Sequence, residues 1–130
     1  MRTQTSIYNH GVAWEEGNSV SQGYSVNGTI FIAGQFSHTL EGEFVDGDAA
    51  AQTRKTLENL DHVLAGFGVG RSNIAAVDIY LVHAKRDFEA VVAVWKAYIG
   101  SHRPAATLVG VNYLASDAQI VEIKAVAHAD

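Results

Sequence analysis

The chain has 130 residues, of which 48% are hydrophobic and 18% charged, so it fits one folded domain spanning residues 1–130 and not a disordered or low-complexity chain. It has no cysteine, which excludes disulfides, thiolate catalysis and cysteine-ligated metal centres. The net charge of −5 disfavours nucleic acid as a partner. The sequence shows neither a leader-peptide pattern nor an apolar run of about 20 residues, so we expect a cytoplasmic protein with no membrane contact.

The first predicted elements are strands. Residues 6–8 suggest a short strand, and two β-rich runs follow at residues 20–26 and 29–33. Asn27 and Gly28 separate these two runs, and both residue types tolerate the positive φ angles of a tight turn. The sequence therefore predicts a β-hairpin here.

A helix is predicted after Gly47, because apolar-face residues then recur at steps of three and four. These residues are Thr53, Leu57, Leu60, Leu64 and Phe67. Asp46 or Asp48 could cap its start, and Gly66 and Gly68 favour its end.

The second half predicts another strand, a second helix and two final strands. Residues 73–83 alternate, with Ala75, Val77, Ile79 and Leu81 expected on one face. Asp87 is expected to cap the second helix, whose apolar stripe runs from Phe88 to Ile99. Strands are predicted over residues 105–114 and 119–127.

Two helices can cover only one face of such a sheet. The opposite face would still carry apolar side chains, namely Tyr80, Val82, Ile120 and Val126. An uncovered apolar face suggests self-association.

Three segments carry a family resemblance. They read TIFIAGQ at residues 29–35, QTRKTLENL at residues 52–60, and RPAATLVGVNYL followed by IVEIKAVA at residues 103–114 and 120–127. Together they resemble the Rid family, also called YjgF or reactive intermediate deaminases. The resemblance implies a chorismate-mutase-like α+β fold, with a mixed sheet and two helices on one face. It also implies a homotrimer built around the sheet faces with ligand clefts between subunits, and hydrolysis of reactive imines and enamines without metal or cofactor.

The sequence departs from the deaminating branch of the family at four positions. That branch has an arginine two residues after the proline, where its planar guanidinium grips a substrate carboxylate. Here the position is Ala106. The tyrosine, serine and asparagine of the deaminase cleft align with Val20, Ala33 and Val92. The glutamate of the last strand is kept as Glu122, so the chain resembles a branch that lacks the arginine.

Glu122 is therefore the candidate catalytic residue, as a group that orients or activates water. The alternative is a structural glutamate paired with Lys124 or with a base of a neighbouring subunit. The candidate substrate-binding residues are Asn112, Ala106, Tyr24, Tyr80, Gln35 and Arg103. Asn112 is expected on the same strand face as Ala106, the two tyrosines could form an aromatic wall, and Arg103 could replace the missing guanidinium.

The six histidines show no spacing typical of a metal site, so neither metal nor cofactor is expected. The favoured function is deamination of a small imine or enamine other than 2-iminobutanoate, because Ala106 replaces the arginine. The alternative is a trimer that binds or senses a small metabolite without turnover. An endoribonuclease, a label that some family members carry, fits the acidic charge least well.

Overall fold

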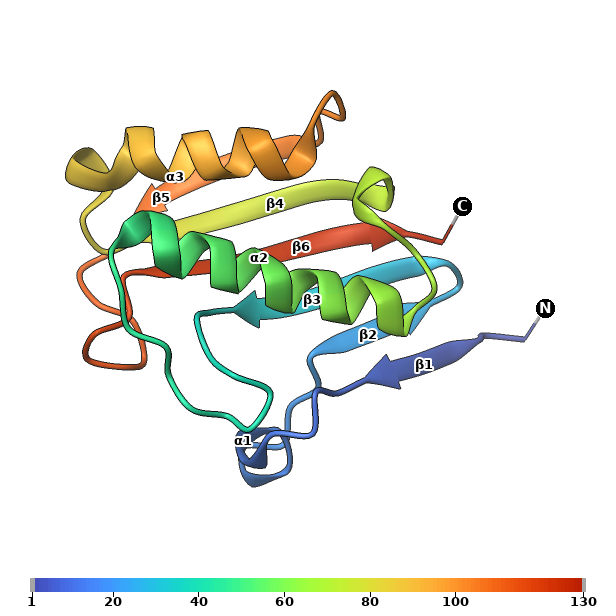
Figure 1. Ribbon diagram of the computed structural model, residues 1–130. Coiled ribbons are helices and arrows are strands. Elements are labelled where there is room, and N and C mark those ends of the chain that lie inside the picture. The colour runs from blue at the N-terminus through green and yellow to red at the C-terminus, as the bar shows by residue number, and fades with distance from the viewer. Residues whose placement is uncertain (1, 130) are drawn as a thin grey trace.

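The computed structural model describes residues 2–129 and contains a single six-stranded sheet with helices on one face (Figure 1). The elements in chain order are β1 (Thr5–Tyr8), α1 (Ala13–Gly17), β2 (Gly23–Val26), β3 (Thr29–Gln35), α2 (Ala49–Gly66), a 3-10 turn (Arg71–Asn73), β4 (Ile74–Leu81), α3 (Ala84–Ile99), β5 (Ala105–Gly110) and β6 (Val121–His128). The strand order is β1-β2-β3-β6-β4-β5, with β4 and β5 parallel and the other pairs antiparallel. The predicted α+β class and mixed sheet are confirmed.

The hairpin between β2 and β3 is confirmed. Val26 pairs with Thr29, and the two residues between them have φ angles of 48° at Asn27 and 89° at Gly28. These positive angles match the right-handed twist of the flanking strands. The turn thereby sets the register that carries the chain into β3.

The hydrophobic core lies between the sheet and the two long helices, which cover the same face (Figure 1). From α2 the predicted stripe is buried at Thr53, Leu57, Leu60 and Leu64. From the sheet the buried residues come from alternate positions of three strands, β3, β4 and β6: Ile30, Ile32, Val77, Ile79, Leu81, Val121, Ile123, Ala125 and Ala127. Within residues 2–129, no helix covers the other face of the sheet (Figure 1).

The start of α2 agrees with the sequence, whereas the start of α3 does not. Asp48 caps α2, because its Oδ1 accepts a hydrogen bond from the backbone N–H of Ala51 at 2.9 Å. The predicted cap at Asp87 is wrong. The helix already begins at Ala84, and Asp87 lies inside its first turn, buried, with its carboxylate bonded to Arg86.

A register shift in β4 corrects the predicted face of one residue. Val77, Ile79 and Leu81 face the core as expected, but Ala75 is exposed and Ile74 is buried in its place. The shift against β6 falls between Ile74 and Ala76, so the alternation changes phase there.

The fifth strand is shorter than predicted. It ends at Gly110, which pairs with Leu81, the last residue of β4. A final bond joins the N–H of Val111 to the carbonyl of Leu81 at 2.9 Å. Because the partner strand β4 ends at Leu81, residues 111–120 form a loop, and the expected strand face shared by Asn112 and Ala106 does not exist.

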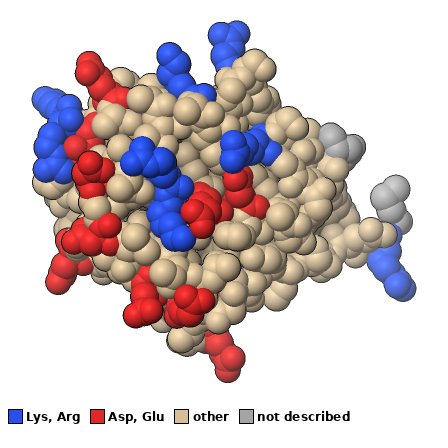
Figure 2. Space-filling model, in the orientation of Figure 1, with Lys and Arg blue, Asp and Glu red and all other residues tan. Residues whose placement is uncertain are grey.

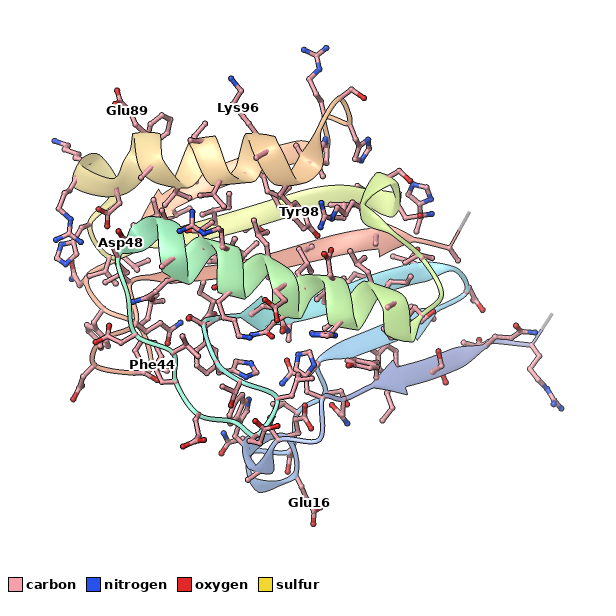
Figure 3. The ribbon with its side chains drawn as sticks, viewed as in Figure 1. Glu16, Phe44, Asp48, Glu89, Lys96 and Tyr98 are labelled. Atoms are coloured by element: carbon pink, nitrogen blue, oxygen red, sulfur yellow. The ribbon has the colours of Figure 1, made fainter. Side chains whose placement is uncertain are left out.

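A polar contact joins the two long helices. Tyr98 on α3 is directed toward α2, where its hydroxyl donates to Asp61 at 2.6 Å (Figure 3). Arg71 donates to both carboxylate oxygens of Asp61, and its guanidinium lies 4.0 Å from the centre of the Tyr98 ring. This contact lies on the helical side of the molecule, away from the uncovered sheet face.

Candidate functional site

Glu122 lies on the uncovered sheet face, near the start of the inner strand β6. Its neighbours Val121 and Ile123 are completely buried on the helix side, so the alternation of β6 directs Glu122 to the other side. The side chain is partly exposed there. Its Cα partner across the sheet is Tyr80 on β4, so these two predicted site residues are brought together.

The carboxylate of Glu122 rests on the backbone of Gly34. A Cβ atom placed on Gly34 would overlap the side chain of Glu122, most severely at Oε2. The φ angle of Gly34 is not in the left-handed region, so the glycine is needed for this close approach and not for an unusual turn. Gly34 is thus part of the site through its missing side chain.

Gln119 holds the other carboxylate oxygen. Its Nε2 donates to Glu122 Oε1 at 3.1 Å and to the carbonyl of Val121 at 3.2 Å. The Gln119 side chain is almost fully buried, at 2% exposure. No donor among residues 2–129 bonds to Oε2 of Glu122, so this oxygen is available to a ligand or to water.

Gln52 on α2 holds the backbone around Gln119. Its Nε2 donates to the carbonyl of Ala118 at 3.0 Å, and its Oε1 accepts from the N–H of Ile120 at 3.1 Å. The Gln52 side chain is buried at 1% exposure. Both flanks of Gln119 are therefore fixed to a long helix.

The pairing of Glu122 with Lys124 is not found. The Nζ atom of Lys124 lies 3.8 Å from Oδ2 of Asp78 on the neighbouring strand, an ion pair at the limit of contact. No cation among residues 2–129 forms an ion pair with Glu122. The carboxylate is therefore held by a neutral amide and a glycine backbone.

The uncovered face continues beyond Glu122 as an apolar row. Tyr24 on β2 pairs with Phe31 on β3, and Phe31 pairs in turn with Val126 on β6. The side chains of Tyr24 and Phe31 are 47% and 49% exposed. Together with Asp78 and Lys124 they line a hollow of about 320 Å³. Tyr24 thus lies on the same face as Glu122, toward the other edge of the sheet.

Gln35 is buried at 1% exposure and has internal partners. Its Nε2 donates to Gln22 Oε1 at 2.8 Å, and its Oε1 accepts from Nε2 of His10 at 2.8 Å. The structure therefore places this predicted substrate-binding residue inside the protein.

Three other predicted residues lie apart from Glu122 within one protomer. Ala106 pairs with Val77, so it shares the helix-facing side of the sheet. Arg103 is exposed in the loop before β5. Asn112 is exposed and, with Tyr113 and Gln119, lines a separate hollow of about 270 Å³. Gln119 is the shared boundary between this hollow and Glu122.

A cluster of three histidines was not predicted, because the residues are distant in sequence. His10 lies 5.6 Å from His38 and 6.4 Å from His62, measured between ring centres. Burial, and then the nearby His62, lowers the pKa of His10, although Gln35 and Glu15 oppose the shift. Burial likewise lowers the pKa of His38, with further contributions from His10 and Lys55.

The arrangement offers groups for general acid–base chemistry. Among residues 2–129 no group of three histidine, aspartate or glutamate side chains could hold a metal ion. In the same range no helix has the length and apolar character needed to cross a membrane. On the face seen in Figure 2, basic and acidic side chains are interspersed and form no continuous basic stripe.

Residues 12–129 match the family model described as Endoribonuclease L-PSP. A RutC family protein of Pyrococcus abyssi is 34% identical over 109 residues, which cover 83% of this chain and 84% of the relative. The human 2-iminobutanoate/2-iminopropanoate deaminase is 32% identical over 108 residues, covering 82% of this chain and 77% of the relative. The crystal structure of yeast Mmf1 has a similar fold, with a TM-score of 0.88 at 22% identity over 98% of this chain and 100% of the other.

Proposed function

Because the chain belongs to the Endoribonuclease L-PSP family, the Rid or YjgF family that its motifs resemble, we propose that it hydrolyses a small reactive imine or enamine and releases ammonia. A 32% identical relative is named a deaminase of 2-iminobutanoate and 2-iminopropanoate. The observation that carries the proposal is the partly exposed Glu122 carboxylate, held at Oε1 by Gln119 and lying over Gly34 at Oε2. A carboxylate with one fixed and one available oxygen suits a general base.

In the proposed reaction, Oε2 of Glu122 accepts a proton from water as the water oxygen bonds to the carbon of the C=N group. The imine nitrogen takes up one proton in this addition, which gives a carbinolamine. The nitrogen takes up a second proton as the carbinolamine hydroxyl loses its own, so Glu122 ends as the carboxylate, the C–N bond breaks, and ammonia and a carbonyl group are released. An enamine first gains a proton on carbon to become the imine. Water supplies the atoms gained by both products, so the reaction needs neither oxidant nor reductant.

We also propose that the working molecule is a homotrimer, in the cytoplasm, with a small-molecule ligand bound between subunits. The exposed side chains of Tyr24 and Phe31, beside the partly buried Val126, support association through the uncovered face. The placement of Arg103 and Ala106 away from Glu122 within one protomer supports a site completed by a second copy.

The substrate is proposed to differ from 2-iminobutanoate in how it is held. Ala106 stands where the deaminating branch has its carboxylate-binding arginine, so a carboxylate on the substrate gains no guanidinium there. Arg103 is the candidate replacement, since it is exposed two residues before β5.

The test uses two imines that differ only in the carboxylate. A flavin amino-acid oxidase generates 2-iminobutanoate from 2-aminobutanoate, and a flavin amine oxidase generates propan-1-imine from propylamine. Ammonia release from each imine is followed with and without the protein. We expect acceleration of at least one imine and no strong preference for the one with a carboxylate. Ala106→Arg should shift the preference toward 2-iminobutanoate by about tenfold or more, as one charge-assisted bidentate contact would. A strong preference for 2-iminobutanoate in the unmodified protein would contradict the proposal about Ala106.

A trimer that binds a metabolite without turnover is the second candidate. The departures at Val20, Ala33, Val92 and Ala106 favour it, because four of five deaminase-site positions differ. Tight binding of an imine's carbonyl product with no acceleration of either imine would support this alternative.

A further inference from the structure

We propose that Gln119 is a positioning residue for Glu122, and that it keeps Oε2 of the carboxylate over Gly34 and open to the ligand. This inference rests on the proposed function for its catalytic meaning, although the geometry itself is independent of any substrate. The motif of the family resemblance around Glu122, IVEIKAVA at residues 120–127, does not include Gln119, which lies directly before it in the loop that leads to β6.

The hydrogen bonds of Gln119 define one orientation of its amide. Both bonds from Nε2 go to oxygen acceptors, Glu122 Oε1 and the carbonyl of Val121. Its Oε1 accepts from the N–H of Ser116 at 3.4 Å. Rotating the amide by half a turn would place an oxygen against two oxygens, so the orientation is fixed by its surroundings.

Burial makes this orientation costly to lose. Gln119 is 2% exposed, so water cannot replace the amide at Oε1 of Glu122 without opening the loop. The loop is held in turn by Gln52, whose side chain bonds to the backbone on both sides of Gln119. The two glutamines thereby link the carboxylate to α2.

As a consequence, the two carboxylate oxygens of Glu122 have different surroundings. Oε1 is occupied by the amide, and Oε2 lies against Gly34, where a side chain would displace it. Without the amide, Glu122 could rotate into other side-chain conformers on the open sheet face. A displaced general base loses most of its advantage, because catalysis depends on alignment to within about an ångström.

The test replaces the amide while keeping the shape of the side chain. Gln119→Met has an unbranched chain of similar length and no N–H donor, and Gln119→Leu serves as a second variant if the first does not fold. Tyr98→Phe is the matched control, because it removes one hydrogen bond of 2.6 Å on the opposite side of the molecule. Folding of each variant is checked by thermal unfolding.

The first measurement is independent of turnover. Three-bond couplings of the Glu122 side chain, measured by NMR, should report one conformer in the unmodified protein and in Tyr98→Phe. They should report averaging among conformers in both Gln119 variants. Unchanged couplings in Gln119→Met and Gln119→Leu would overturn the proposal.

The second measurement uses the imine that the protein hydrolyses faster. We expect Gln119→Met to lower kcat about 10- to 100-fold with little change in KM, and to have no further effect when Glu122 is already Gln. An equal loss in both backgrounds would contradict a role through Glu122. If neither imine is hydrolysed but the couplings change as expected, the positioning role of Gln119 is supported and the proposed deaminase function fails.

Discussion

Oε2 of Glu122 lies against the backbone of Gly34, at the point where any other residue would carry its Cβ atom. The two residues come from β6 and β3, which are far apart in the sequence and adjacent in the sheet. The close approach gives Gly34, which belongs to the TIFIAGQ motif, a physical role, because a residue without a side chain leaves room for the carboxylate. This relationship places the predicted catalytic group and a family motif in one site.

Replacement of Gly34 by Ala should therefore displace Glu122. We expect an activity loss of about tenfold or more and a decrease in the free energy of unfolding of about 1–3 kcal/mol, the usual cost of overpacking. Imine hydrolysis and urea unfolding measure the two effects.

Gly70→Ala is the matched control, since no atom lies within 4 Å of the position of its Cβ and its φ of −129° suits any residue. It should change neither quantity. Full activity in Gly34→Ala would show that the contact with Glu122 is dispensable.

The uncovered sheet face predicts association between copies of the chain. Phe31→Glu would bury a charge in such an interface, and we expect the mass in sedimentation equilibrium to fall from that of a trimer to that of a monomer. Phe88→Glu is the control, because Phe88 is equally exposed, at 48%, but lies on α3. A monomeric unmodified protein would contradict the proposed assembly.

The histidine cluster predicts that stability falls in mild acid. The pKa values of His10 and His38 are lowered in the folded protein, mainly by burial, so the unfolded chain binds more protons than the folded one below the ordinary histidine pKa of about 6.5. The free energy of unfolding should therefore be at its full value above pH 7. It should decrease as the pH falls below about 6.5 toward the lowered pKa values of the two histidines in the folded protein.

Urea midpoints at pH 7.5 and pH 5 measure this effect. The midpoint should be lower at pH 5, and the difference should shrink in His10→Gln. Thr53→Val removes a buried hydrogen bond within α2 without changing a titrating group, so it should leave the difference intact. Equal midpoints at the two pH values would refute a contribution from the cluster.

The start of α2 provides a test of the capping assignment. Asp48, labelled at the beginning of the helix in Figure 3, accepts from the N–H of Ala51, and its replacement by Ala should lower the free energy of unfolding by about 1 kcal/mol. Asp46 accepts from the N–H of the adjacent Gly47, which lies outside α2, so Asp46→Ala should have a smaller effect. The reverse order would assign the cap to Asp46.

Local signals predicted the elements that depend on neighbouring residues. The hairpin at Asn27 and Gly28 and the buried stripe of α2 follow from turn chemistry and from helical spacing, and both are confirmed. The strand expected over residues 105–114 is too long, because its branched residues continue after its partner β4 has ended at Leu81. Whether a residue finds a partner strand depends on the whole sheet.

The candidate site was predictable only in part, for the same reason. The family resemblance identified Glu122, and alternation along β6 placed it on the uncovered face. Gln119 carried no recognisable signal, because it acts through a loop. Gln52 opens the QTRKTLENL motif, but its role was not predictable, because it contacts residues 66 and 68 positions away. The short helix α1 was also missed, because it is fixed by contacts that leave no periodic pattern, such as the buried Glu15, which accepts the backbone N–H groups of His10 and Gly11.

The most direct test compares ammonia release from 2-iminobutanoate and propan-1-imine by the unmodified protein and by Glu122→Gln, with ligand affinity measured separately by calorimetry on the stable carbonyl products. Loss of the proposed general base should lower the rate about 10²- to 10⁴-fold while the products still bind, because glutamine keeps the shape and can still accept from Gln119. Acceleration of an imine by Glu122→Gln at the rate of the unmodified protein would contradict the central role of this carboxylate.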